Sequence, residues 1–180
     1  VGFTDVRGAL VFSPVKTNLS DAVVKSRKGE PTYSAPSGEA DAYAAACEAL
    51  EQCGARLAMG MVSRGGVLVV ETPRVVIDPS FGATLAEWRD KVTPGSVRLA
   101  KGSTWVMEGD LKHVSIERLD VEGALKVRVC PGARVVLKRV RVRNRGWRFL
   151  SLGSLAAGGC TVPEALAIRG YGLEKREARE

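Results

Sequence analysis

Short runs of alternating apolar and polar residues fill most of the second half of the chain. Alternation with a period of two, rich in Val, Ile and Leu, is typical of strands with one buried face. Such runs occupy residues 67 to 71, 74 to 78, 97 to 100, 104 to 108, 113 to 119, 124 to 129 and 134 to 143. Gly, Pro, Asp or Asn separates them. The pattern predicts a β-rich body.

A helical pattern precedes these strands. Ser37 is placed as an N-cap, and Glu39 and Asp41 would suit the first turn of a helix whose small and apolar residues recur at helical spacing. Gly54 can end this helix in a left-handed conformation. A second, shorter amphipathic helix is predicted over residues 84 to 92. We expect both helices to pack against the strands.

The strand-rich part contains a faint internal repeat. Residues 114 to 123 align with residues 135 to 144 at a spacing of 21, with apolar positions and a final Gly or Asn in register. A period near twenty in strand-rich sequence indicates the stacked coils of a β-helix. An antiparallel sheet or a jelly roll would give similar alternation.

The formal charge of +7 comes from one basic segment. Residues 123 to 163 carry nine bases and no acid, which leaves 18 bases against 20 acids elsewhere. The bases are Lys126, Arg128, Arg134, Lys138, Arg139, Arg141, Arg143, Arg145 and Arg148.

Arginines at every second position from Arg139 to Arg145 would share one face of a strand. Such a face is either simply solvated or binds an anionic partner, namely nucleic acid, a polysaccharide or a protein. It could also mediate assembly with another subunit. Only Trp147 and Phe149 follow the arginines, and this scarcity of aromatic residues argues against nucleic acid.

Cysteine usage and hydropathy bear on the compartment. Cys47, Cys53, Cys130 and Cys160 form no C-x-x-C pair, and His113 is the only histidine, so the sequence predicts no metal site and free thiols in a reducing compartment. The sequence contains no run of eighteen apolar residues and no recognisable signal peptide. We expect a cytoplasmic protein, and the lack of an initiator methionine suggests a fragment.

One stretch near the start carries candidate chemistry. An apolar run reaches Phe12, a turn follows at Pro14, and Lys16 projects a mobile ammonium beside Ser13, Thr17 and Asn18. A cation held there could bind phosphate. The simpler interpretation is a strand that ends in a turn with a solvated lysine.

Four blocks in order resemble the carboxy-terminal part of the UDP-sugar pyrophosphorylases, within the UDP-glucose pyrophosphorylase superfamily. They are Phe-Ser-Pro-Val-Lys-Thr-Asn at 12 to 18, Lys-Gly-Glu-Pro with Ser-Ala-Pro-Ser-Gly-Glu between 28 and 39, Asn-Arg-Gly-Trp at 144 to 147, and Thr-Val-Pro-Glu with Ile-Arg-Gly-Tyr between 161 and 171. The similarity extends over nearly the whole chain, although residues 57 to 143 match mainly in their strand-like pattern of apolar and polar residues.

The resemblance implies an α+β fold in two parts. Residues 1 to 55 would be the trailing strand and helix of a Rossmann-like nucleotidyltransferase domain, and residues 60 to 180 a short left-handed β-helix-like domain. It also implies an enzyme that makes a UDP-sugar and pyrophosphate from UTP and a sugar 1-phosphate with Mg²⁺. The lysine of the family's Pro-Val-Lys block, which matches Lys16, lies against the phosphates, and Ser13, Thr17 and Asn18 would stand nearby.

The same resemblance implies that much of the active site lies outside these residues. In the family, the Gly-rich nucleotide-binding loop, the uridine pocket and the metal-binding carboxylate belong to the amino-terminal domain, and no matching motif occurs in this sequence. We therefore expect the chain alone to be inactive and the Mg²⁺ ligand to lie elsewhere in the parent protein.

Overall fold

The computed structural model describes residues 35–64, 67–151, 154, 161–163, 166 and 171–175. Its helical elements are α2 (Ala35–Gln52), η1 (Pro79–Phe81) and α3 (Leu85–Lys91). The strands are β1 (Arg56–Leu57), β2 (Gly60–Arg64), β3 (Val67–Glu71), β4 (Arg74–Ile77), β5 (Val97–Leu99), β6 (Thr104–Gly109), β7 (Val114–Ile116), β8 (Leu119–Glu122), β9 (Ala124–Val129), β10 (Val135–Leu137), β11 (Val140–Arg143), β12 (Trp147–Ser151) and β13 (Tyr171–Lys175).

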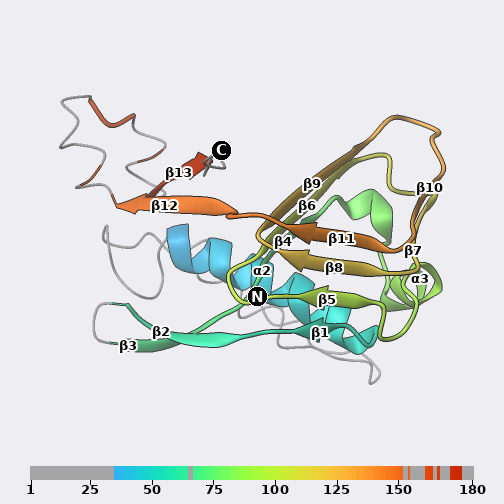
Figure 1. Cartoon of the computed structure of the whole chain (residues 1–180), viewed down its shortest axis with the longest axis horizontal. Helices are drawn as coiled ribbons and strands as arrows, with labels where there is room; N and C mark the ends of the chain where they lie inside the picture. Colours follow the sequence, from blue (N-terminus) through green and yellow to red (C-terminus); the bar gives the residue numbers. More distant parts are fainter. Residues whose placement is uncertain are drawn as a thin grey trace, which may run out of the picture.

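Three parallel sheets form the body of the described structure. The largest has the order β1-β5-β8-β11, a second has the order β4-β6-β9, and β7 pairs with β10 in the third. Figure 1 shows β11, β8, β5 and β1 side by side, with the β4-β6-β9 sheet inclined to them. The result is a mixed α and β structure with no closed barrel among its described strands.

The sheet register confirms the repeat seen in the sequence. Val114 pairs with Val135, and Leu119 pairs with Val140, so each partner lies 21 residues further along the chain. The parallel direction of these ladders excludes the antiparallel sheet and the jelly roll for these strands. Because apolar positions recur with the same interval, the inward-facing side chains of successive layers stack on one another.

Two of the predicted strands are wrong in extent. Residues 113 to 119 form not one strand but β7 and the start of β8, and residues 134 to 143 form β10 and β11 in different sheets. The second break lies at Arg139, whose φ is 58°. A positive φ is incompatible with a continuing strand, so the chain turns a corner there. Alternation alone did not reveal these corners.

The core lies between the three parallel sheets. Trp105 and Met107 of β6, Ile116 of β7 and Leu119 of β8 have almost no exposed surface. They alternate with exposed or half-buried neighbours, as strands with one buried face require. Full burial of each such side chain stabilises the fold by about 1.5–3 kcal/mol. The same core includes Cys47 and Leu50 of α2.

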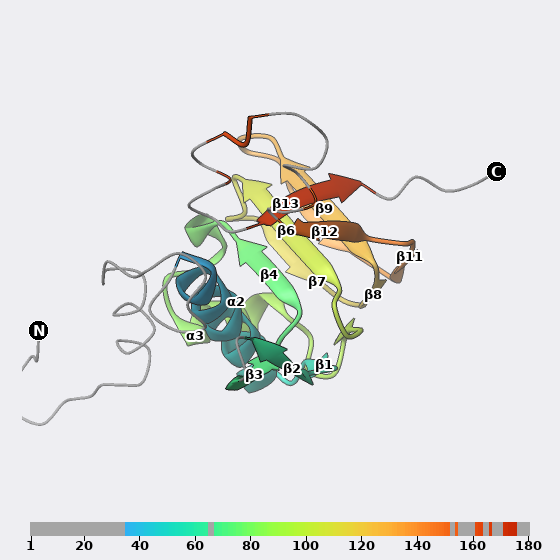
Figure 2. The same cartoon turned by 90° about the vertical axis from the view of Figure 1, so that its left-hand side faces the viewer.

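Helix α2 lies alongside β4 (Figure 2). It begins at Ala35, two residues before the predicted N-cap, so Ser37 is a buried helical residue. The first turn contains no acidic residue, so the predicted placement of Glu39 and Asp41 in that turn is also wrong. Gly54 follows the helix with a φ of 84°, which confirms the left-handed end.

Helix α3 forms where its pattern predicts it. Thr84 is the N-cap and accepts a hydrogen bond from the Glu87 N–H, while the Glu87 carboxylate accepts one from the Thr84 N–H at 2.9 Å. This capping box satisfies donors that the first turn of a helix leaves free. The pKa of Glu87 is lowered because its carboxylate accepts hydrogen bonds from the backbone N–H and the hydroxyl of Thr84 and from the Ala83 N–H.

Two antiparallel hairpins flank the parallel sheets. Strands β2 and β3 pair in one, and β12 and β13 in the other. Met61, Leu68 and Val70 lie on one face of the first hairpin and are each more than half exposed. Neither described helix is long and apolar enough to cross a membrane.

Candidate functional site

The site predicted near the start of the chain lies outside the described residues. This applies to the candidate phosphate-binding Lys16 and to Ser13, Thr17 and Asn18 around it. Their roles therefore stay predictions.

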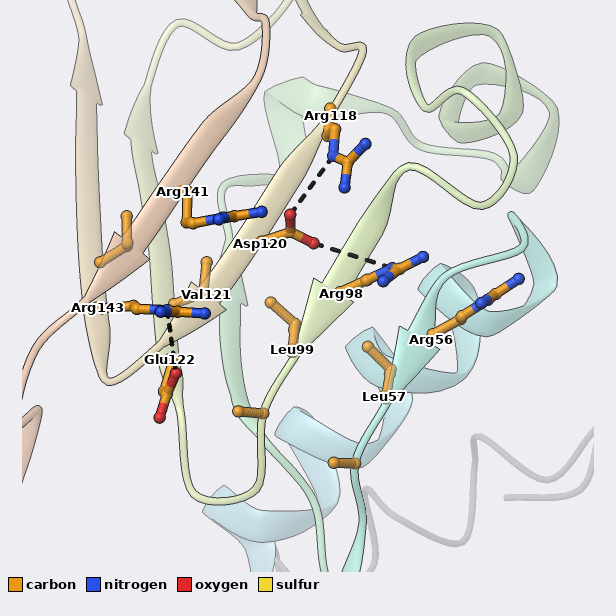
Figure 3. Close-up of a pocket in the computed structure, with 13 residues that line it drawn as sticks. Arg56, Leu57, Arg98, Leu99, Arg118, Asp120, Val121, Glu122, Arg141 and Arg143 are labelled. Atoms are coloured by element: carbon orange, nitrogen blue, oxygen red, sulfur yellow. Dashed lines mark hydrogen bonds and ion pairs between the residues drawn. The ribbon is translucent and has the colours of Figure 1, made fainter.

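The described structure contains a different candidate, an arginine-walled hollow on the outer face of the β1-β5-β8-β11 sheet (Figure 3). Its volume is about 500 Å³. Its lining includes five arginines and only two carboxylates, which leaves an excess of three positive charges. The charged residues are Arg56, Arg98, Arg118, Asp120, Glu122, Arg141 and Arg143.

The sheet register builds this arginine face. Arg56 pairs with Arg98, Arg98 with Asp120, and Asp120 with Arg141, so the four side chains form one row across the strands. Neighbouring strands in a sheet are about 4.8 Å apart, so these residues stand close together although 85 positions separate the first from the last. Leu99, the next residue along β5, points into the core.

The hollow exists because the next outward-facing row begins with two small residues. Ala58 and Ala100 follow β1 and β5, and the Ala58 N–H donates to the Leu99 carbonyl at 2.9 Å, which continues the parallel pairing. Glu122 and Arg143 occupy the same row on β8 and β11. Two methyl groups beside long charged side chains leave a depression with a charged wall.

Asp120 organises the arginines around it. Its Oδ1 lies 3.9 Å from Nε of Arg98, and its Oδ2 lies 3.4 Å from Nε of Arg118. Figure 3 shows the ion pairs of the two guanidinium groups converging on this carboxylate. The Asp120 side chain is only 20% exposed, whereas both arginines are about half exposed. The carboxylate therefore orients two cations that remain accessible to solvent.

Arg143 is the third arginine of the hollow with an ion pair, through Nε to Oε2 of Glu122 at 3.5 Å. Arg56 and Arg141 have no carboxylate within 4.0 Å among the described residues. These two exposed cations stand at opposite ends of the row, on β1 and β11. They are the free positive charges of this face.

The arginine face differs from the one predicted from the sequence. Of the arginines from 139 to 145, only Arg141 and Arg143 belong to β11, because Arg139 stands at a corner and Arg145 follows the strand. Sequence reasoning missed Arg56 and Arg98, which come from distant strands. Their signal was the position of each just before a leucine in a short strand, Leu57 half-buried and Leu99 buried, but the pairing of those strands was not visible.

Two other groups of chemical interest serve the fold. The Cys47 thiol is buried, and its Sγ lies 3.3 Å from the Pro73 carbonyl oxygen. Burial raises its pKa to about 11, so the thiol stays protonated. Glu108 accepts hydrogen bonds from Lys126 and Arg128, which lower its pKa. Within the described ranges, no three His, Cys, Asp or Glu side chains gather as metal ligands.

Comparisons with known proteins place the chain beside one group of enzymes. It is 32% identical over 182 aligned residues to UDP-sugar pyrophosphorylase of Arabidopsis thaliana, and 30% identical over 181 to the proteins of the same name in Oryza sativa subsp. indica and japonica. No known protein-family profile matches the chain. The whole chain is matched, yet it spans only 28% of the length of each relative. The resemblance inferred from the four sequence blocks is thus confirmed, and the chain is similar along its full length to a part of the UDP-sugar pyrophosphorylases.

Proposed function

We propose that this chain is the carboxy-terminal part of a UTP:sugar-1-phosphate uridylyltransferase of the UDP-sugar pyrophosphorylase type. The observation that carries the proposal is the match of all its residues to three curated proteins of that name. The parent enzyme would convert UTP and a sugar 1-phosphate into a UDP-sugar and pyrophosphate. Free thiols at Cys47, Cys53 and Cys130 suit the cytoplasmic location included in this proposal.

In the proposed reaction, the phosphate oxygen of the sugar 1-phosphate attacks the α-phosphorus of UTP, and pyrophosphate leaves. Catalysis of such a transfer depends mainly on positioning and on neutralising charge. Lys16 would offset the charge that develops on the α-phosphate and the leaving group, since an ammonium is a compact charge with three donors. Ser13, Thr17 and Asn18 would hydrogen-bond to phosphate oxygens nearby.

Mg²⁺ is part of the proposal only for the parent protein. The described residues contain no cluster of ligating side chains that fits the ion. We therefore propose that its ligands lie elsewhere in the parent protein.

The division of the chain into residues 1 to 55 and 60 to 180 is also proposed. In the parallel pairs β5-β8, β6-β9, β7-β10 and β8-β11 the partner lies 20 to 22 residues further along the chain, which supports a β-helix-like second part. Helix α2, assigned by resemblance to the first part, shares the core of these sheets. It would hold the two parts together in the parent enzyme.

The exposed apolar face of the β2-β3 hairpin fits a chain that belongs to a larger protein. Met61, Leu68 and Val70 present neighbouring apolar side chains to solvent. Contiguous exposed apolar patches commonly mark contact surfaces.

The proposal predicts inactivity of the isolated chain and activity of the parent. Purified chain incubated with UTP, Mg²⁺ and several sugar 1-phosphates should release no pyrophosphate, whereas the full-length protein should release it stoichiometrically with UDP-sugar. Turnover by the isolated chain would contradict the proposal that the nucleotide-binding and metal-binding residues lie elsewhere in the parent protein. Absence of turnover in the full-length protein with every sugar 1-phosphate tested would overturn the proposed reaction.

Lys16 can be tested separately in the full-length protein. Lys16→Ala should lower kcat by orders of magnitude with the unfolding transition unchanged, because charge neutralisation at phosphorus would be lost. Lys112→Ala, at an exposed lysine of the sheet domain, is the matched control and should keep the rate. An undiminished rate for Lys16→Ala would remove this lysine from the mechanism.

A non-catalytic module that binds an anionic partner was the alternative expected from residues 139 to 145. Arg141 and Arg143 of that stretch line the hollow together with Arg56, Arg98 and Arg118, and this grouping supports anion binding there.

A further inference from the structure

We propose that the hollow on the outer face of β1, β5, β8 and β11 binds an oligophosphate, meaning two or three linked phosphate groups. This function is separate from the proposed transfer chemistry at Lys16. It rests on the arginine row, the small residues Ala58 and Ala100 beside it and the size of the hollow.

Charge supplies the first argument. The hollow has an excess of three positive charges, and Arg56 and Arg141 have no carboxylate within 4.0 Å among the described residues. Exposed cations that repel one another are stabilised by a multiply charged anion placed between them. A single monovalent anion would leave most of this charge uncompensated.

The orientation of the inner arginines supplies the second argument. Arg98 and Arg118 contact Asp120 through Nε, so the N–H groups of their terminal nitrogens remain for a ligand. The carboxylate fixes the two guanidinium groups in advance and lowers the ordering cost of binding. A guanidinium fork matches phosphate oxygens in a bidentate way, which an ammonium cannot do.

The alanine floor gives the ligand room. Ala58 and Ala100 lie beside the arginine row, and a longer side chain at either position would fill the depression. Since neighbouring strands stand about 4.8 Å apart, Arg56 and Arg98 project from backbones whose spacing is comparable to the length of a diphosphate. Linked phosphates lying across the strands would meet one arginine after another.

The size and chemistry of the lining favour a small anion over a polymer. A volume of about 500 Å³ lies within the range of small-molecule sites. Among the described residues, no aromatic side chain lines the hollow, so single-stranded nucleic acid finds no surface there on which its bases can stack. Without an aromatic side chain in the lining, a nucleobase would not be recognised, and the affinity would come from the phosphates alone.

Calorimetric titration of the full 180-residue chain with inorganic tripolyphosphate tests the proposal. We expect saturable binding that weakens between about 50 and about 200 mM NaCl, as contacts between arginines and phosphates require. The double variant Arg56→Gln/Arg141→Gln should raise Kd roughly tenfold, because each removes a charge-assisted contact. Arg134→Gln, an exposed arginine outside the hollow, is the matched control and should change Kd less than twofold.

A second variant tests the shape of the hollow without changing its charge. Ala100→Leu should weaken tripolyphosphate binding severalfold by filling the floor, with the circular dichroism spectrum unchanged. UTP and tripolyphosphate should bind with similar Kd values, since no lining residue recognises a base. A much tighter Kd for UTP would overturn the proposal by showing that the nucleoside is recognised.

Three further outcomes would overturn it. They are no tripolyphosphate binding at low salt, equal binding by the double variant and the parent chain, and binding of heparin or duplex DNA far tighter than that of tripolyphosphate through the same arginines. Lys16→Ala should leave tripolyphosphate affinity at the hollow unchanged. A lack of oligophosphate binding at the hollow would therefore not contradict the uridylyltransferase proposal. A lack of uridylyltransferase activity would likewise not contradict oligophosphate binding.

Discussion

The side chain of Asn144 completes the backbone hydrogen bonding of Ala124 across two layers of the fold. Its Oδ1 accepts from the Ala124 N–H at 2.7 Å, and its Nδ2 donates to the Ala124 carbonyl at 2.8 Å. The Gly146 N–H also donates to Oδ1, at 2.9 Å. The Asn144 amide follows directly after β11 and takes the place of a backbone peptide group beside the first residue of β9.

Asn144→Ala should lower the free energy of unfolding by about 1–3 kcal/mol. The substitution leaves the donor and acceptor of Ala124 and the Gly146 N–H without their partner, although solvent can replace part of what is lost. Urea denaturation followed by circular dichroism measures this change. Arg145→Ala, next in the chain and exposed, is the control and should shift stability by less than about 0.5 kcal/mol. An equal effect of both would show that the Asn144 amide does not stabilise this corner.

Gly123→Ala should destabilise the protein more than Gly132→Ala. Gly123 has a φ of 109°, and a Cβ there would lie 2.1 Å from Oδ1 of Asn144. Gly132 also has a positive φ, 74°, but a Cβ there would meet nothing within 4 Å. Both variants bear the conformational strain of about 1 kcal/mol or more, and only the first adds a steric clash. Thermal unfolding of both compares them directly, and a larger loss for Gly132→Ala would contradict the structure.

Cys47 should make stability fall at alkaline pH. Burial raises its pKa from the ordinary 9.0 to about 11, so the unfolded chain loses the thiol proton first. Its contribution is complete below pH 9 and is lost as pH rises towards about 11, a change of on the order of 3 kcal/mol at most. Denaturation of the parent chain and Cys47→Ala at several pH values should show a shallower alkaline slope for the variant. Parallel slopes would mean that the thiol ionises equally well in both states.

Asp110 should make the stability of the fold fall at acidic pH, whereas Cys47 acts at alkaline pH. Its carboxylate accepts hydrogen bonds from the backbone N–H groups of Gly132, at 3.0 Å, and Lys112, and these contacts lower its pKa. Its stabilisation is present above the ordinary carboxyl pKa and is lost as pH falls below it. Asp110→Asn should flatten the loss of stability on acidification. Urea denaturation of the parent chain and of Asp110→Asn at several acidic pH values measures the difference, and parallel slopes would contradict this role of Asp110.

The sequence predicted those features that depend on local patterns or on a repeated pattern. The apolar positions of residues 114 to 123 recur in 135 to 144, and stacking them in register buries both sets at once. For that reason the interval of 21 was visible before the structure. Helix α3 was visible because Leu85, Trp88 and Val92 recur at helical spacing with polar residues between them.

The corners and the arginine-walled hollow were not predictable in the same way. The corner between β10 and β11 falls at Arg139, a residue with no turn preference, so nothing local marks it. The hollow depends on Arg56 lying beside Arg98, which are 42 positions apart. Such a pairing is set by how the strands stack rather than by either segment alone. The order of residues along the chain therefore does not show which side chains from separate strands come together.

An interval of 20 to 22 residues separates the partners in the pairs β5-β8, β6-β9, β7-β10 and β8-β11 and defines one turn of the chain in this region. Duplicating one complete turn would insert a new layer whose interior matches the layers above and below it. Deleting one residue inside a strand would instead swap interior and exterior side chains from that point to the next corner. Natural variation in the length of this domain should accordingly come in whole turns, or else be confined to the corners.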